Sequence, residues 1–278
     1  MTGALARILL LALLLPACAH AQRDPEGVVA ELRKLAWLRG PAEGKIGATA
    51  TIRIPERYAF LGEGDTRRFL ELMGNPPRDR HFMVAPQDIA WFAVFSFDAV
   101  GYVKDDEKID ADALLESLKK GDERSNEERK RLGLAPIYID GWHVSPHYDA
   151  ETRRLEWGMR LRDDKGGVHV NYSSRLLGRS GVMSAVLVSS PKRLGEDMNE
   201  FKTVLRGFEF ATGERYAEFR PGDRVAEYGL GALVLGGAAA AAAKAGLFKT
   251  AGKFLWLLIP AFAGIWAAVR KFVSRKRG

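Results

Sequence analysis

Apolar and polar residues alternate along several short runs of the chain, and these runs predict β-strands. Residues 46–54 place isoleucine and alanine on one side and threonine and arginine on the other, and Pro55 ends the run, which predicts one half-buried strand. Residues 89–97, IAWFAVFSF, are apolar on both sides and predict a central strand that is covered on both faces. Residues 137–144 form a further strand-like run.

Three more strand-like runs follow one another closely. They span residues 153–162, 168–177 and 181–190, and the connections DDKGG and GRSG are typical of tight turns. This spacing predicts an antiparallel meander. Runs with a helical period lie elsewhere, at residues 64–74, 111–133 and 194–208. Because these helices do not alternate regularly with the strands, the pattern predicts an α+β fold with flanking helices.

The C-terminal part contains two uncharged apolar runs, residues 228–243 and 254–269, separated by a lysine-containing segment and followed by a basic tail at 270–278. Neither run has a polar face, so we expect a transmembrane helical hairpin. Small residues at Ala232, Gly236 and Ala240 would let its two helices approach closely.

An alternative to the hairpin is one span followed by a re-entrant or interfacial helix that bends at Pro260. The two arrangements put the basic tail on opposite sides of the membrane, and the sequence does not decide between them.

The first 21 residues have the composition of a secretory signal. Arg7 precedes an apolar core at residues 8–15, and Ala19-His20-Ala21 fits a cleavage site. The single cysteine of the chain, Cys18, lies in this segment. It is either removed with the signal or becomes a lipid attachment site.

The net charge of +7 comes from the ends of the chain rather than from its body. Residues 1–21 hold one base and residues 228–278 hold eight bases and no acid, which leaves 33 bases against 35 acids in residues 22–227. Basic residues that flank apolar runs are explained by topology and anionic lipids. The slightly acidic body therefore excludes nucleic acid as the expected partner.

The densest group of acids is GYVKDDEKID at residues 101–110. Its second half is explained by helix capping, with Asp110 and Asp112 at the start of the following helix. Asp105, Asp106 and Glu107 remain as a candidate carboxylate site. The stretch lacks the glycine and glutamate that an EF-hand requires.

Two histidines have a spacing that occurs in metal sites. His143 and His147 lie four residues apart, but Pro146 argues against the helix that would bring both rings to one face. We expect a strand that runs into a turn here, so they are weak candidates as metal ligands. The body shows no glycine-rich phosphate loop or dinucleotide fingerprint, and we expect no cofactor.

Several stretches together resemble one protein family. They are GNP at 74–76, WFAVFSFDAVGYVKDDEKIDADALL at 91–115, GWHVSPHYD at 141–149, LEWG at 155–158, NYSSRLLGRSG at 171–181 and YGLGALVLGG at 228–237. The chain resembles the bacterial membrane-anchored proteins grouped as domain of unknown function 2167. The resemblance implies an inner-membrane protein with a large extracytoplasmic domain, and it implies no reaction. The signature residues are Gly101, Tyr102, Val103, Asp105, Asp106, Glu107, Trp142, Pro146, Tyr148, Asp149, Asn171, Arg175, Gly178, Arg179 and Gly181.

Two functions are consistent with these patterns. The first is a non-enzymatic binding, sensing or scaffold module of the cell envelope, with residues 22–227 in the periplasm, the C-terminal helices in the inner membrane, and an envelope protein or small ligand as partner. The second is a tethered hydrolase or metal-dependent enzyme. It would use Asp105, Asp106, Glu107, Asp149 and Arg175, and it requires these side chains to converge in one cleft.

Overall fold

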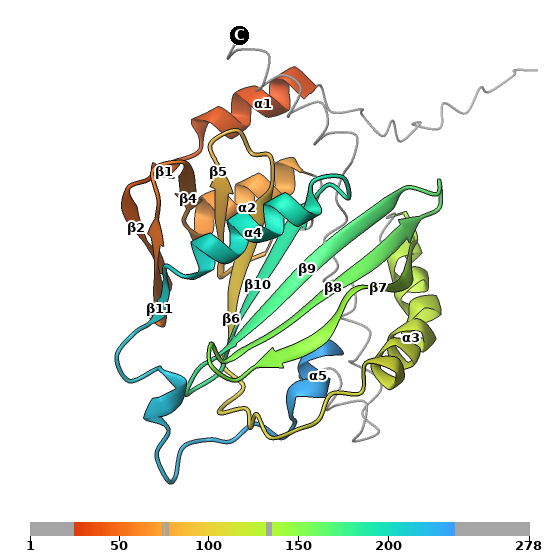
Figure 1. Ribbon diagram of the computed structural model, residues 1–278. Helices are drawn as coiled ribbons and strands as arrows, with labels where there is room; N and C mark the ends of the chain where they lie inside the picture. Colours follow the sequence, from red (N-terminus) through yellow and green to blue (C-terminus); the bar gives the residue numbers. More distant parts are fainter. Residues whose placement is uncertain (1–24, 74, 76–77, 132–134, 237–278) are drawn as a thin grey trace, which may run out of the picture.

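The fold is built on one large antiparallel sheet. The computed structural model describes residues 25–73, 75, 78–131 and 135–236. Eight strands form the large sheet, in the order β1-β4-β5-β6-β10-β9-β8-β7, and β11, β3 and β2 form a second, smaller sheet (Figure 1). The strands are β1 (Leu38–Arg39), β2 (Ala42–Ile46), β3 (Ala50–Ile54), β4 (Tyr58–Leu61), β5 (His81–Pro86), β6 (Phe92–Asp98), β7 (Ile137–Asp149), β8 (Arg154–Asp163), β9 (Val168–Leu177), β10 (Val182–Ser189) and β11 (Phe208–Phe210).

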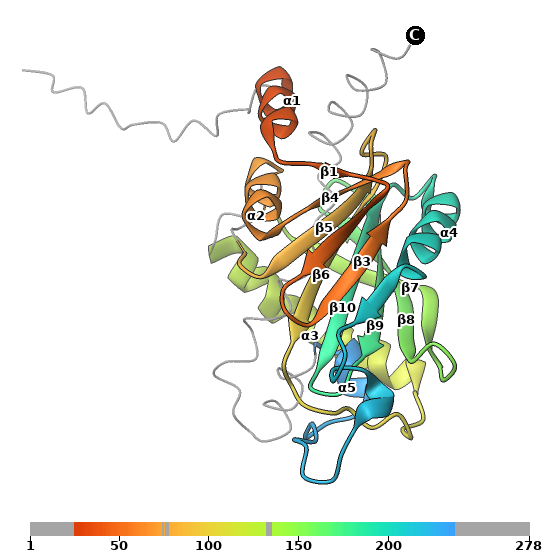
Figure 2. The ribbon, with the colours of Figure 1, turned by 90° about the vertical axis from the view of Figure 1, so that its left-hand side faces the viewer.

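Helices cover both faces of the large sheet. They are α1 (Pro25–Lys34), α2 (Glu63–Leu72), α3 (Ala111–Arg131), α4 (Leu194–Leu205) and α5 (Leu230–Val234), with a 3-10 turn at Tyr216–Glu218. Figure 2 shows α2 and α4 on opposite sides of the sheet.

The alternation of side chains along the strands defines the two faces. In β6, Ala93 and Phe95 pack with α4 and the small sheet, whereas Phe92 and Val94 pack with α1 and α2. A third cluster, under α3 and α5, lies on the same face as α1 and α2, at the β7 end of the sheet.

Most of the predicted elements are confirmed. β8, β9 and β10 form the expected meander, and β6 is central, paired with β5 on one side and β10 on the other. The two charged runs after residue 110 form the single helix α3. Asp110 caps this helix, because its Oδ1 accepts a hydrogen bond from the backbone N–H of Ala113 at 3.0 Å.

Two predicted strand boundaries are wrong. The run at 46–54 is not one strand, because β2 and β3 form a hairpin in which Ile46 pairs with Ala50 and Gly47 turns with φ +60°. Apolar and polar residues keep alternating through this turn, so the sequence pattern does not show where β2 ends and β3 begins. The strand at 137–144 continues through Pro146 to Asp149. A proline is tolerated there because β7 is the edge strand of the sheet.

The start of the first C-terminal apolar run is folded into the domain. Within the described residues, this run forms the short helix α5, in which Leu230, Leu233 and Val234 are buried in the third cluster beside α3. In the part of the chain that the structure describes, no helix is long and apolar enough to cross a membrane. The rest of the 228–243 run, the 254–269 run, the basic tail and the 1–21 segment lie outside the described residues.

Candidate functional site

Residues 101–107, which we call the signature loop, contact several segments that are distant in sequence, at one end of the large sheet. The backbone N–H of Gly101 donates to Ser180 O at 3.0 Å, and that of Tyr102 donates to Arg224 O at 2.8 Å. Gly101 has φ +94°, and a Cβ there would lie 2.6 Å from Arg224 O. Glycine is therefore required, both for the backbone conformation and for the close approach of the two chains.

Asp105 is the acid of the loop that makes the most contacts. Its Oδ2 accepts a hydrogen bond from the hydroxyl of Tyr148 at 2.8 Å and forms an ion pair with Arg153. Partial burial alone would raise the pKa of Asp105, but the hydrogen bond from Tyr148, the nearby hydroxyl of Tyr216 and the charge of Arg153 outweigh it. The pKa therefore lies below its usual value, and the group is ionised at neutral pH.

Stacked aromatic rings lie behind this ion pair. The ring of Tyr102 lies 4.3 Å from that of Tyr216 and 4.3 Å from that of Phe219. The hydroxyl of Tyr216 donates to Val103 O at 3.0 Å, and the Arg153 guanidinium lies 5.1 Å above the Tyr216 ring. The signature loop is thus held against the 3-10 turn by stacking, hydrogen bonding and a cation–π contact.

Glu107 connects the loop to the first turn of α5. Its Oε2 accepts a hydrogen bond from the backbone N–H of Gly231 at 3.0 Å, which satisfies a donor that the helix itself leaves free. A Cβ at Gly229 would lie 2.2 Å from the same oxygen. A side chain at residue 229 would therefore require the Glu107 carboxylate to move from this position.

A forked ion pair fixes the segment between the 3-10 turn and α5. Arg179, in the turn between β9 and β10, donates from Nε and Nη2 to the two oxygens of Asp223, each at 2.7 Å. Hydrogen bonds from Arg179 and from the backbone of Arg220 lower the pKa of Asp223 to about 2. We call the signature loop, the 211–225 segment and α5 together the latch.

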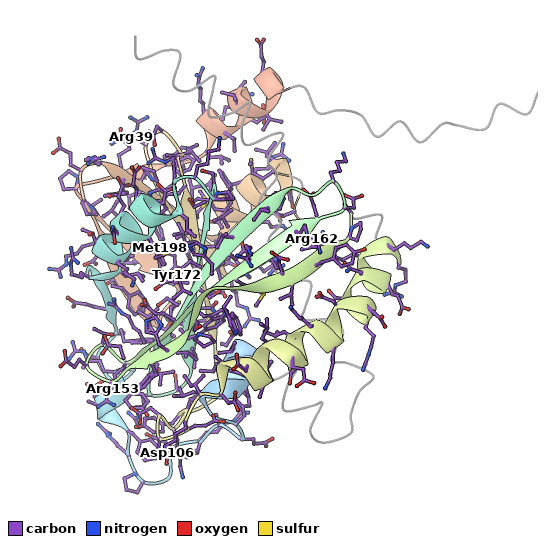
Figure 3. All side chains as sticks on the ribbon, turned by 45° about the vertical axis from the view of Figure 1, so that its right-hand side comes forward. Arg39, Asp106, Arg153, Arg162, Tyr172 and Met198 are labelled. Atoms are coloured by element: carbon purple, nitrogen blue, oxygen red, sulfur yellow. The ribbon has the colours of Figure 1, made fainter. Side chains whose placement is uncertain are left out.

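The acids proposed from the sequence do not gather in one cleft. Asp106 is exposed, at the end of the molecule where Figure 3 labels it together with Arg153. Asp149 accepts hydrogen bonds from Thr152 Oγ1 at 2.7 Å and the Glu151 backbone at 2.9 Å, within its own turn. Asp105 and Glu107 contact different segments, as described above.

Arg175, the cation of the same hypothesis, lies in the sheet away from these acids. Its guanidinium lies 4.9 Å above the ring of Trp157, and its Nη1 is buried without a hydrogen-bond partner among the described residues. Burial lowers the pKa of Arg175 to about 10, an effect that the negative charge of Asp98 opposes. The contacts of Arg175 therefore indicate packing on Trp157 rather than pairing with the predicted carboxylates.

The two histidines also lie apart from any cluster of metal ligands. His143 is exposed, whereas His147 Nε2 lies 3.7 Å from an oxygen of Glu156. No group of three or more His, Cys, Asp or Glu side chains in the described ranges could hold a metal ion.

Sequence reasoning missed a buried polar cluster around Glu156. This carboxylate is 6% exposed and accepts hydrogen bonds from Tyr172 at 2.9 Å and Ser174 at 3.2 Å. Lys202 Nζ lies 3.3 Å from it. Little signal was available, because Glu156 falls on the side of β8 that alternation makes polar, together with Arg154 and Arg160.

Fold and latch together define a class of protein: an α+β domain with one large antiparallel sheet, whose end holds the start of an apolar C-terminal segment. The chain belongs to the family described as protein of unknown function DUF2167, whose model matches residues 39–267.

Among solved structures, the chain is similar to the solution structure of cyanobacterial PsbP (CyanoP) from Synechocystis sp. PCC 6803. The two share 9% sequence identity with a TM-score of 0.36, over 61% of this chain and 92% of that chain. No curated protein matches the chain.

Proposed function

We propose that the protein is a membrane-anchored module of the bacterial cell envelope that binds, senses or scaffolds rather than catalyses. Its domain would lie in the periplasm, and the apolar residues after α5, with the run at 254–269 as their longer part, would hold it to the inner membrane. The observation that carries this proposal is the latch. The first residues of the apolar segment are folded into the core of the domain and are not part of a free linker.

The latch fixes the start of the apolar segment in the domain. Leu230 is 0% exposed, and Leu233 and Val234 pack beside it. Moving α5 away would expose these side chains at a cost of about 1.5–3 kcal/mol for each one fully uncovered. A change in the domain is therefore coupled to the segment that follows α5, as a sensing or scaffold role requires.

Two further features support membrane anchoring. The family match extends to residue 267, so it includes the first apolar run and nearly all of the second. Bases flank the second run on both sides, at Lys249, Lys253, Arg270 and Lys271, as expected for a segment next to anionic headgroups.

The described geometry favours binding over catalysis. A hydrolase would need Asp105, Asp149 and Arg175 to face one bound molecule. Each instead has its own structural contacts: Arg153 and Tyr148 for the first, the β7–β8 turn for the second, and Trp157 for the third.

Fractionation of cells tests the anchoring proposal. We expect the full chain to stay in the membrane fraction after alkaline carbonate extraction, and a chain that ends at Gly236 to appear in the soluble periplasmic fraction. The physical reason is that this truncation keeps the latch residues but removes the last seven residues of the first apolar run and the whole second run.

The variant Cys18→Ser of both chains is the control for a lipid anchor. If the full chain is extracted by carbonate, the anchoring proposal is wrong. It is also wrong if the shortened chain stays in the membrane, and the Cys18→Ser form then shows whether a lipid on that cysteine is responsible.

A further inference from the structure

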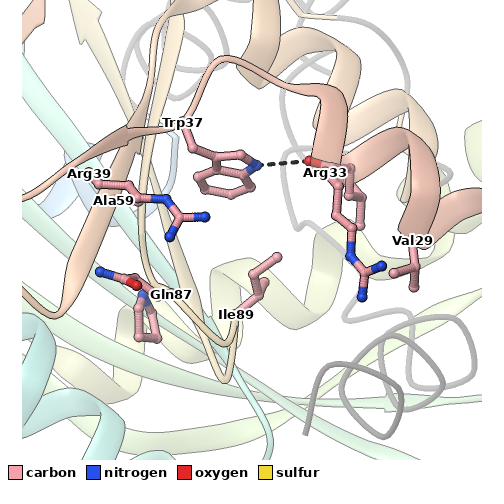
Figure 4. Close-up of a pocket in the computed structure, with 9 residues that line it drawn as sticks. Val29, Arg33, Trp37, Arg39, Ala59, Gln87 and Ile89 are labelled. Carbon is pink, nitrogen blue, oxygen red and sulfur yellow. Dashed lines mark hydrogen bonds between the residues drawn. The ribbon is translucent and has the colours of Figure 1, made fainter. Parts of the chain in front are cut away.

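A cavity of about 350 Å³, drawn in Figure 4, is lined by α1, β1 and β4, which lie at the opposite end of the domain from the latch in Figure 1. It opens between α1, β1, β4 and the loop after β5. Its volume is near the lower limit of small-molecule sites, which run from about 300 to 1,000 Å³. The residues that line it are Val29, Leu32, Arg33, Trp37, Arg39, Ala59, Pro86, Gln87 and Ile89.

The indole ring of Trp37 forms a fixed apolar wall. Its Nε1–H donates to Leu32 O at 2.8 Å, so the polar edge of the ring is already satisfied. The ring also meets Phe69 edge-on, with the centroids 6.2 Å apart. A ring held at two points presents a flat face at little entropic cost to a bound planar group.

The opposite wall is strained. Ile89 has φ +52°, a left-handed conformation that is rare for a β-branched residue. Hydrogen bonds hold the loop in place: the Ile89 backbone N–H donates to Pro86 O at 2.8 Å, and Gln87 Nε2 donates to Glu56 O at 2.8 Å. Strain of this kind is concentrated at binding sites, where the surrounding structure maintains it.

The charged side chains of the lining are all positive. The described residues around the cavity include two arginines and no acid. In Figure 4, Arg39 and Ile89 point into the space below the Trp37 ring. A guanidinium beside an apolar wall suits a molecule that has both an anionic and an apolar part, because the planar fork matches a carboxylate.

We propose that this cavity binds a small amphipathic carboxylate, with a flat apolar body against Trp37 and Ile89 and its carboxylate on Arg39. This inference deepens the binding role by naming a ligand class. It rests on the proposed function only in treating the protein as a binding module. Because it does not depend on the membrane anchor, its failure would leave the fractionation result unchanged.

Titration calorimetry on the full chain in nanodiscs of zwitterionic lipid tests the assignment, with empty discs subtracted. The probe is naphthalene-2-carboxylate, and its neutral amide, naphthalene-2-carboxamide, is the matched comparison. We expect saturable binding of the carboxylate that is about tenfold tighter than that of the amide, since only the carboxylate forms a charged pair with the guanidinium.

Variants locate the site. Arg39→Gln should weaken carboxylate binding about tenfold, because the exposed Arg39 provides the charge without supporting the fold. Arg57→Gln removes the same charge from an exposed arginine outside the lining and should change binding by less than about twofold. Trp37→Leu should weaken carboxylate and amide alike, because both use the ring face.

Three results would overturn the proposal. They are no saturable binding of the carboxylate, the same affinity for the amide as for the carboxylate, or an equal loss of carboxylate affinity in Arg39→Gln and Arg57→Gln. A repeat in discs that contain phosphatidylglycerol separates the possible sources of the anion. Unchanged affinity supports a free carboxylate, whereas competition by the anionic lipid assigns the site to a headgroup and overturns the small-molecule assignment.

Discussion

At the scale of single residues, Asp105 shows what the acidic stretch does. One carboxylate oxygen joins the signature loop to the β7–β8 turn through Tyr148 and Arg153. Arg153 reaches it from a left-handed backbone conformation, φ +54°, and also covers the ring of Tyr216. The sequence makes Asp105 a candidate for metal binding or catalysis. In the structure, its negative charge is already paired with Arg153.

Replacing Asp105 should loosen the latch. We expect Asp105→Ala to lower the free energy of unfolding by about 1.5–3 kcal/mol, the cost of removing a charged hydrogen-bond partner. The control is the exposed neighbour Asp106. Asp106→Ala should change the free energy of unfolding by less than about 0.5 kcal/mol. Urea titrations of the full chain in detergent, followed by tryptophan fluorescence, provide the measurement.

The effect of pH gives this prediction a second outcome. Because the pKa of Asp105 is lowered in the folded protein, its contribution is complete above about pH 4, the unfolded value, and declines as the pH falls through the folded pKa. The difference in the free energy of unfolding between the wild type and Asp105→Ala should therefore become smaller at acidic pH. Equal losses in the Asp105 and Asp106 variants, or a difference that does not depend on pH, would contradict the role assigned to this carboxylate.

At the scale of elements, local patterns predicted the strands that end in strong turn signals. The meander β8–β10 was found because Gly166-Gly167 and Gly178 interrupt its apolar runs. The β2–β3 hairpin was missed because isoleucine and alanine continue their alternation through its turn. Hydrophobic period alone does not mark a reversal of direction when the turn residues are themselves small and apolar.

The candidate site was less predictable than the fold, because its contacts join residues that are far apart in sequence. Glu107 meets Gly231, and Asp105 meets Tyr148. No local pattern shows that a carboxylate will be matched by an amide 124 residues later. The sequence identified the signature loop as a family signature. The residues that the loop contacts could be identified only from the folded structure.

Helix α5 gives a prediction at this scale. Leu230→Ala should lower the free energy of unfolding by about 2–5 kcal/mol, because Leu230 is fully buried in the domain core. Leu38→Ala makes the same chemical change at a residue that is 42% exposed, and it should cost less than about 1 kcal/mol. The same urea titration compares them, and equal small losses would show that Leu230 is not part of the folded core.

At the scale of the whole molecule, the two ends of the domain are built differently. The cavity at Trp37 and Arg39 is open to a ligand, whereas the latch closes around the start of the apolar segment. The body between them is nearly neutral, and the excess of bases lies in residues 228–278. This division fits a module that presents one end to the periplasm and the other to the membrane.

A disulfide tests whether the signature loop holds the start of the apolar segment. A Cβ built on Gly229 would lie 3.4 Å from Cβ of Glu107, close to the ~3.8 Å typical of disulfides. Replacing Glu107 by cysteine also removes the oxygen that obstructs this position. The experiment is mild oxidation of membranes that contain the full chain with Cys18→Ser, Glu107→Cys and Gly229→Cys, followed by mass spectrometry of its peptides.

The matched control places the first engineered cysteine at Asp106 instead of Glu107. We expect a nearly complete cross-link for the 107–229 pair and little for the 106–229 pair, because the atoms nearest to a Cβ on Gly229 all belong to Glu107 and none to Asp106. Absence of the 107–229 cross-link, or equal cross-linking of both pairs, would contradict the latch.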